Sequence, residues 1–469
     1  YLQMANSLWD DCDLYSPFYP LNEDILLDLT IDINAVEKDT LRRLAARVRD
    51  IAAEPVQAVK RGNWIEHNTL RSTNPMVLAI PEGAWLDCTP ASTVVSRHPL
   101  IRGWEKRLRM MIYQHEIIND DYVTEPYFNI GWVGGFTGFK IENRQEIENN
   151  DNLWTSEKSY YLHANHDNTL LSAQFSGNLH HEPPLRDPDD LKHLKCDGYQ
   201  IDKEKTYQHL KTATEIFGDL LPVRLHGWMW VTGGFAQHAV SLRGYDQLML
   251  DIYDRPEWVH DFLSFLGRSV DKSLVELEAS GCLSTNHEGD WIGTGGLGYT
   301  DELPVAGYKP GSVRCRDIWG FAECQDLVGF SPDVLDEFFF PYMLPSLARF
   351  GLNHYGCCEP VHDHIHLLRK IPRLRRVSIS PWCDIKKAAE KLGGDFIFSM
   401  KPNPTALSVT DIDEDEITAE LVSHLRITRA NGCVVEILMK DLHNIKQQPQ
   451  RIADWVKLAR KAVDKVYGG

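Results

Sequence analysis

The fold is decided by the stretch Asn353-His354-Tyr355-Gly356-Cys357-Cys358-Glu359-Pro360, which is followed after one short helix by Ser378-Ile379-Ser380-Pro381-Trp382-Cys383-Asp384. Each stretch opens as a short apolar strand and ends in groups that bind metal ions. Thiolates are preferred zinc ligands, and the chemistry of α/β barrels takes place at the carboxyl ends of the strands. The pattern therefore predicts a zinc site at the mouth of a barrel, with Cys357, Cys358, Cys383 and Glu359 as ligands.

The chain around this stretch shows the alternation of strands and helices that builds a parallel sheet. We expect strands at residues 223–231, 282–286, 352–356, 376–380, 395–400 and 433–439. A helix is predicted from Pro256 to Gly281, because apolar residues recur every three or four positions and glycine is favoured just past a helix end. Polar residues follow most of these strands. The expected fold class is α/β, a (β/α)8 TIM barrel with an N-terminal helical or irregular extension.

The N-terminal part is less regular than the rest. Residues 36–60 are predicted to form an amphipathic helix, and 76–80 a strand that places Glu82 just beyond its end. Residues 100–185 show little periodicity and are interpreted as a cap on the barrel. We therefore expect two parts: an extension and cap over 1–200, with a possible first barrel strand near 76–80, and a barrel over 201–469.

Composition limits the partners. The formal charge of -18 disfavours nucleic acid and anionic membranes, and no apolar run approaches the roughly 20 residues that span a bilayer. The ten cysteines are irregularly spaced and no secretory leader is recognised, which favours reduced thiols in a cytoplasmic enzyme. A homo-oligomer is compatible with these features.

From Gly244 onward the order of segments resembles the uroporphyrinogen decarboxylase superfamily. The resemblance rests on four stretches: Gly244-Tyr245-Asp246, Phe330-Ser331-Pro332-Asp333, Tyr355-Gly356-Cys357 and Ser399-Met400-Lys401-Pro402-Asn403-Pro404. It covers roughly residues 200–469. It implies a TIM barrel and one of two activities, either decarboxylation without a metal or zinc-dependent methyl transfer to a corrinoid.

The chain departs from both branches in particular places. The arginine-rich motif of the decarboxylases is not found near the first strand, and Tyr355-Gly356-Cys357 stands where the methyltransferases carry His-x-Cys. Asp441-Leu442-His443 is similar to the start of a corrinoid-binding motif, but Lys446 replaces its glycine. The resemblance thus implies a zinc-dependent methyltransferase or demethylase that passes a methyl group from a small methylated substrate, such as an ether, to cobalamin carried by a separate corrinoid protein.

Further candidates lie at the expected strand ends. Glu288 and His287 are proposed proton donors to the leaving group. The candidate substrate-binding residues are Glu82, Trp228, Asp290, Lys401, Asn403, Asp441 and His443. The glycine-rich run 293–298 lacks the context of a phosphate-binding loop and is interpreted as a flexible loop. The alternatives are a metal-free decarboxylase or lyase that uses Lys401 on a carboxylated small molecule, and a binding protein without catalysis.

Overall fold

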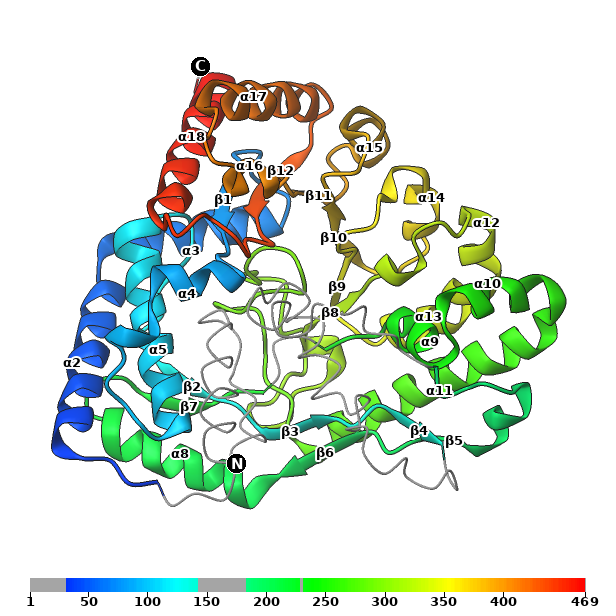
Figure 1. Ribbon diagram of the computed structural model, residues 1–469, viewed down its shortest axis with the longest axis horizontal. Helices are drawn as coiled ribbons and strands as arrows, with labels where there is room; N and C mark the ends of the chain where they lie inside the picture. The colour runs from blue at the N-terminus through cyan, green and yellow to red at the C-terminus, as the bar shows by residue number, and fades with distance from the viewer. Residues whose placement is uncertain (1–30, 142–182, 228–230, 469) are drawn as a thin grey trace.

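The computed structural model describes residues 31–141, 183–227 and 231–468. Its centre is a six-stranded parallel sheet with the order β1-β12-β11-β10-β9-β8. The strands are β1 (Met76–Ala79), β12 (Val434–Met439), β11 (Ile397–Met400), β10 (Leu374–Ile379), β9 (Leu352–Tyr355) and β8 (Trp319–Ala322). Figure 1 shows them as an arc with α15, α17 and α18 along its outer side. The expected α/β class is confirmed.

The strands of this sheet are buried along nearly their whole length, as parallel strands covered on both faces require. All residues of β1, β8, β9, β11 and β12 are buried. The strands predicted near 76–80, 352–356, 376–380, 395–400 and 433–439 are therefore confirmed to within a few residues. β8 was not predicted.

Helices next to the sheet begin or end where proline or glycine gives a strong local signal. The helix predicted from Pro256 is α11 (Pro256–Ser280), and Gly281 ends it in the left-handed region at φ 72°. The predicted helix over 36–60 is instead two helices, α2 (Ala35–Ala52) and α3 (Pro55–Asn68). Pro55 lacks the N–H that a continuous helix needs, so the chain restarts there.

The remaining helices and strands surround these elements. The helices are α4 (Trp85–Cys88), α5 (Pro99–Tyr113), α8 (Lys203–Phe217), α9 (Ala236–Arg243), α10 (Tyr245–Asp254), α12 (Pro332–Val334), α13 (Phe340–Leu347), α14 (Ile365–Leu368), α15 (Ile385–Leu392), α16 (Thr405–Ser408), α17 (Glu414–Ala430) and α18 (Gln450–Tyr467). Two antiparallel pairs join β3 (Val133–Phe136) to β6 (Tyr199–Asp202) and β4 (Phe139–Ile141) to β5 (Leu194–Cys196). None of the helices in the described ranges combines the length and the apolar character needed to cross a bilayer.

A further parallel pair of strands consists of β2 (Phe128–Ile130) and β7 (Val223–Leu225). Segments next to this pair in the sequence contact both edges of the six-stranded sheet. At the β8 edge, Thr232 forms a parallel bridge with Phe321. At the β1 edge, the Asp121 N–H donates to the Val77 carbonyl at 2.9 Å, and the Asp120 carboxylate accepts from the Ala79 N–H at 2.9 Å. These contacts satisfy backbone groups that an open edge would leave unpaired.

The glycine-rich run is a buried plug, so the expectation of a flexible loop was wrong. Residues 290–298, here called the glycine plug, are buried throughout and form a hairpin joined by a bridge between Trp291 and Leu297. Thr294 at its tip donates from Oγ1 to the Gly356 carbonyl at 2.7 Å. The Gly296 N–H donates to the Glu436 carboxylate at 2.9 Å. These hydrogen bonds replace water for a backbone that would otherwise be unpaired.

The glycines of the plug are needed for space. A Cβ on Gly295 would lie 2.4 Å from Cδ of Arg376, and one on Gly298 would lie 2.1 Å from the Asn286 carbonyl oxygen. Both distances are too short for any side chain. The segment 282–286 before the plug is not a strand, contrary to the prediction. The Asn286 side chain instead brackets Trp319 with two hydrogen bonds, of 2.8 and 3.0 Å.

Candidate active site

Chemically active side chains gather where the parallel strands end. Cys357 and Cys358 follow β9, and Glu323 follows β8. Lys401 follows β11, and Lys440 and Asp441 follow β12. Together with Glu82 and His443, these residues form what we call the strand-end site. Its members are Glu82, Glu323, Cys357, Cys358, Lys401, Lys440, Asp441 and His443. Parallel strands share one carboxyl edge, so these groups belong to one face of the molecule.

The two adjacent cysteines form a thiol pair, with 3.5 Å between their Sγ atoms. Gly356, at φ 101°, turns the chain at the end of β9. The Glu359 carboxylate then fixes the bend, because it accepts from the Cys357 N–H at 2.8 Å and from the Cys324 N–H at 2.9 Å. Glu359 therefore ties the ends of β8 and β9 together. Both of its oxygens are already engaged.

The charge state of the thiol pair is asymmetric. The hydrogen bond from Cys357, helped by the nearby Lys440 ammonium, lowers the pKa of Cys358, whereas the same hydrogen bond and burial raise the pKa of Cys357. Lys440 Nζ lies 3.8 Å from Cys358 Sγ and also contacts the Asp441 carboxylate. Cys358 is thus the more acidic thiol of the pair, and the Lys440 ammonium is placed to stabilise its thiolate form.

A second group consists of Glu82, Asp441 and His443, whose donor atoms lie within 4.8 Å of one another. His443 Nε2 is 3.7 Å from Glu82 Oε2. Burial, reinforced by the neighbouring Asp441, raises the pKa of Glu82 to about 7. A carboxyl group in this position gains from a bound cation, because two nearby carboxylates repel each other.

The backbone at this second group is unusual. Glu82 and Asp441 both adopt left-handed conformations, at φ 47° and φ 59°. Side chains other than glycine pay strain energy there, and such positions concentrate at functional sites. Gly83 keeps the approach open, since a Cβ on it would lie 2.9 Å from His443 Nδ1. Two carboxylates and one imidazole held in this way match the donor set of a divalent cation site with an open position.

The thiol-based ligand set from the sequence is only partly brought together. Cys357 and Cys358 meet, but Cys383 is buried and its sulfur lies 3.7 Å from Ser380 Oγ. In the described part of the chain, three metal donors within 4.8 Å of one another occur only at Glu82, Asp441 and His443. Three residues that the sequence suggested for substrate binding, Glu82, Asp441 and His443, therefore make up the candidate metal group.

Lys401 lies below the thiol pair in a buried hydrogen-bond network. Its ammonium donates to Ser378 Oγ at 2.7 Å and to Ser399 Oγ at 2.8 Å. Burial lowers its pKa to about 7. Ser378 also hydrogen-bonds Thr294 at 3.0 Å, so the tip of the glycine plug is joined to the hydrogen-bond network of Lys401. Asn403, by contrast, accepts from the Thr405 N–H at 3.0 Å and stabilises a turn.

The predicted acid–base residues lie elsewhere. Glu288 pairs with Arg224 at 3.0 Å, and Asp290 pairs with His226 at 2.6 Å. Asn286, two residues before Glu288, hydrogen-bonds Trp319, the first residue of β8, so this amino-end cluster, with His287 beside it, lies toward the start of the parallel strands. The chain reaches it because residues 282–286 lead into the plug and not to a strand end. Trp228 lies outside the described residues.

Glu323 is a site residue that sequence reasoning missed. Burial, followed by the nearby Glu359, raises its pKa well above the usual carboxyl value. Ile318 to Ala322 is an apolar run directly before it, which is the same signal that identified the other strands. Lys440 also followed a predicted strand, and Ser378 lay within one, without either being singled out.

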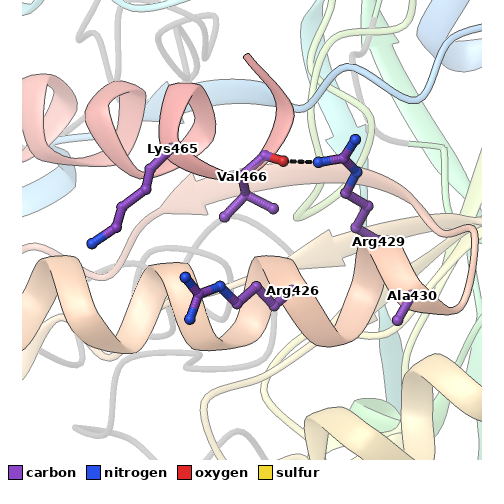
Figure 2. A pocket seen from close by; sticks show the side chains of 5 residues that line it. All are labelled: Arg426, Arg429, Ala430, Lys465 and Val466. Carbon is purple, nitrogen blue, oxygen red and sulfur yellow. Dashed lines mark hydrogen bonds between the residues drawn. The ribbon is translucent and has the colours of Figure 1, made fainter. Parts of the chain in front are cut away.

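A surface hollow between the ends of α17 and α18 offers three cations, Arg426, Arg429 and Lys465 (Figure 2). Arg429 donates to the Val466 carbonyl, which is one of the last in α18. Cations at helix C-termini offset the negative end of the helix dipole and satisfy unpaired carbonyls. Capping of the helix ends therefore accounts for the cations in this hollow.

Comparisons with known proteins found little. No protein-family model matches the sequence, and no curated protein matches it. Among solved structures, a methyltransferase from Methanosarcina mazei is similar, with a TM-score of 0.32 and 12% identity over 55% of this chain and 63% of that chain. The match thus spans less than two thirds of that structure. A likeness this weak does not identify the reaction, and the strand-end site remains the basis for assigning a function.

Proposed function

We propose that the strand-end site is the active site of a metal-dependent methyltransferase on a (β/α)8 barrel, which moves a methyl group from a small methylated substrate to a corrinoid protein. The observation that carries the proposal is the convergence of Glu82, Asp441 and His443 beside the thiol pair. These groups come from β1, β9 and β12, which are far apart in the sequence.

The contacts of the glycine plug support the proposed barrel. Gly293 and Gly295 approach inward side chains of three strands: Phe321 of β8, His354 of β9 and Arg376 of β10. Gly296 approaches Glu436 of β12. One narrow hairpin contacts four strands of a sheet in this way only if the sheet curves around it. In the proposed barrel, the pair β2–β7 and the contacts at both sheet edges would supply the remaining part of the ring.

Glu82, Asp441 and His443 would hold the metal ion, for which zinc is the proposed identity. When bound there, zinc would supply Lewis-acid polarisation of an ether oxygen, which would weaken the bond to the methyl group. Lys440 limits the negative charge that accumulates near the ligands. Burial raises the pKa of Glu323 well above the usual carboxyl value and so favours its protonated form, which suits it to protonate the departing oxygen. In this role it replaces Glu288 and His287.

The reaction class comes from the sequence resemblance of residues 200–469 and from the need for a strong nucleophile. None of the side chains at the site attacks an ether methyl group readily, whereas a reduced corrinoid does. The corrinoid would arrive on a partner protein. In that arrangement the partner docks over the open carboxyl-end face, where the thiol pair and Glu82 are found.

Metal analysis of purified variants tests the ligand set. We expect His443→Ala and Asp441→Asn to lose most of the bound zinc, and Cys383→Ser to retain it. Substitution of Cys358 by Ser decides between the two donor sets: zinc loss there with retention in His443→Ala would favour the sulfur ligands. Zinc well below one per chain in the unaltered protein would reject the metal proposal.

A second candidate is favoured by Lys401. A buried amine with a pKa of about 7 is suited to hold a substrate carboxylate in a metal-free decarboxylase. Methylated and carboxylated small molecules should be offered in parallel. Corrinoid methylation that disappears in His443→Ala supports the methyltransferase. Release of CO2 that survives metal removal and disappears in Lys401→Met supports the decarboxylase.

A further inference from the structure

The thiol pair has a geometry that a strand does not allow. Successive side chains of a strand point to opposite faces, so adjacent cysteines are normally kept apart. Here the turn at Gly356 and the two hydrogen bonds to Glu359 place both sulfurs on one side, 3.5 Å apart. Bond formation between them requires the sulfurs to approach to about 2 Å.

The pair also differs from the other cysteines in access and surroundings. Among the nine described cysteines, Cys196, Cys357 and Cys358 are partly exposed and the rest are buried. Cys196 contacts Ser273 Oγ at 3.8 Å, and burial raises the pKa of its thiol. Cys358 has an ammonium group 3.8 Å from its sulfur. A partly exposed cysteine whose sulfur lies beside a cation and a second thiol is the arrangement found at redox-active cysteines.

We propose that Cys357 and Cys358 form a redox-active dithiol that reacts with small organic disulfides, such as glutathione disulfide, and closes to a disulfide between the two residues. The proposal goes beyond the methyltransferase function and does not depend on it. It adds a reversible covalent modification at the entrance to the same site.

The steps balance with one equivalent of the small disulfide. The Cys358 thiolate attacks one sulfur of that disulfide, which forms a mixed disulfide and releases one glutathione thiolate. Cys357 then loses its proton and attacks Cys358 Sγ, which forms the protein disulfide and releases the second glutathione thiolate. The dithiol is oxidised by two electrons and the small disulfide is reduced by two.

The product should be easy to reduce. Adjacent α-carbons are about 3.8 Å apart, whereas most disulfides join α-carbons at about 4.4 to 6.8 Å. The resulting strain raises the reduction potential, so the bond is labile and suited to a reversible switch. Oxidation also leaves Lys440 facing a disulfide in place of a thiol, which changes the surroundings of the candidate metal group.

Mass spectrometry of the intact protein and its peptides tests the proposal in glutathione redox buffers. The expected result is the loss of two hydrogens, located in the peptide that holds both cysteines and reversed by reduced glutathione. Cys357→Ser should accumulate one glutathione on Cys358, because the resolving thiol is gone. Cys358→Ser should react at Cys357 at least about tenfold more slowly.

Cys196→Ser is the matched control, since it removes a partly exposed cysteine without a thiol neighbour, and it should behave like the unaltered protein. Circular dichroism and zinc content are measured on the same samples, so a failure of the metal proposal is recognised separately. Glutathione incorporation that is equal at Cys196 and Cys358, or the absence of the linked peptide at oxidising poise, would overturn the proposal.

Discussion

The two ends of the parallel strands arrange their charged groups in different ways. At the amino end and around the plug, acids face bases: Arg224 with Glu288, His226 with Asp290, and Arg376 with Glu436 at 3.1 Å. At the carboxyl end, Lys440 contacts Asp441 and His443 lies near Glu82, but groups of the same kind also crowd together. Glu82 lies beside Asp441, Glu323 beside Glu359, and Cys357 beside Cys358.

This difference distinguishes charged groups that stabilise the fold from groups that are suited to function. Matched buried charges stabilise one geometry, and removal of either partner is costly. Crowded like groups raise or lower one another's pKa and favour a proton, a cation or a substrate that relieves the repulsion. The Arg376 guanidinium overcomes the effect of burial and lowers the pKa of Glu436. Burial and Asp441 instead raise that of Glu82 to about 7.

The most sensitive test of this comparison replaces one glutamate by glutamine in each of the two regions. Glu436→Gln leaves the fully buried Arg376 without its counter-charge and should lower the free energy of unfolding by about 3 to 5 kcal/mol. Glu82→Gln relieves a repulsion and should change that free energy by less than about 1 kcal/mol, in either direction. Urea denaturation followed by circular dichroism measures both. Equal losses at the two positions would remove the distinction.

The plug can be tested by adding a single methyl group. Gly295→Ala places a Cβ 2.4 Å from Cδ of Arg376 and should cost about 1 to 3 kcal/mol of stability. Gly62 in α3 is the matched control, because no heavy atom lies within 4 Å of the Cβ position there. Gly62→Ala should stabilise the protein by about 0.5 to 1 kcal/mol through helix propensity. A Gly295→Ala protein as stable as the parent would show that the plug is loosely packed.

The pH dependence of the free energy of unfolding tests the lowered pKa of Lys401. Its pKa is about 7 in the folded protein and returns to about 10.4 on unfolding. Between these values the unfolded chain binds a proton that the folded protein has released. The free energy of unfolding should therefore rise with pH above 7, by at most about 1.4 kcal/mol per pH unit from this group, and not below it.

Two variants isolate that contribution. Lys401→Met should flatten the rise between pH 7 and 10, because the buried amine is gone. Lys386→Met, at a side chain that is 73% exposed, should leave the slope unchanged. If both variants kept the full slope, the rise would come from other groups, and the low pKa of Lys401 would be rejected.

Local sequence determined most of the central sheet. β9 to β12 and α11 were predicted because apolar periodicity, proline at a helix start and Gly281 at a helix end act over a few residues. The placement of polar residues after those strands also predicted Glu82, Cys357, Cys358, Lys401, Asp441 and His443 as site residues. The same reasoning missed β8, although Ile318 to Ala322 carried the signal.

Tertiary structure decided which of those residues meet. Glu359 bends the chain at the thiol pair only because Cys324, at the end of another strand, offers it an N–H. The run 293–298 has the composition of a flexible loop, and it becomes a buried plug only where Phe321, Arg376 and Glu436 surround it. Contacts between distant segments arise from chain packing, and no local pattern encodes them. For that reason Glu288 and Asp290 resembled strand-end residues in the sequence, yet they lie at the opposite end of the sheet.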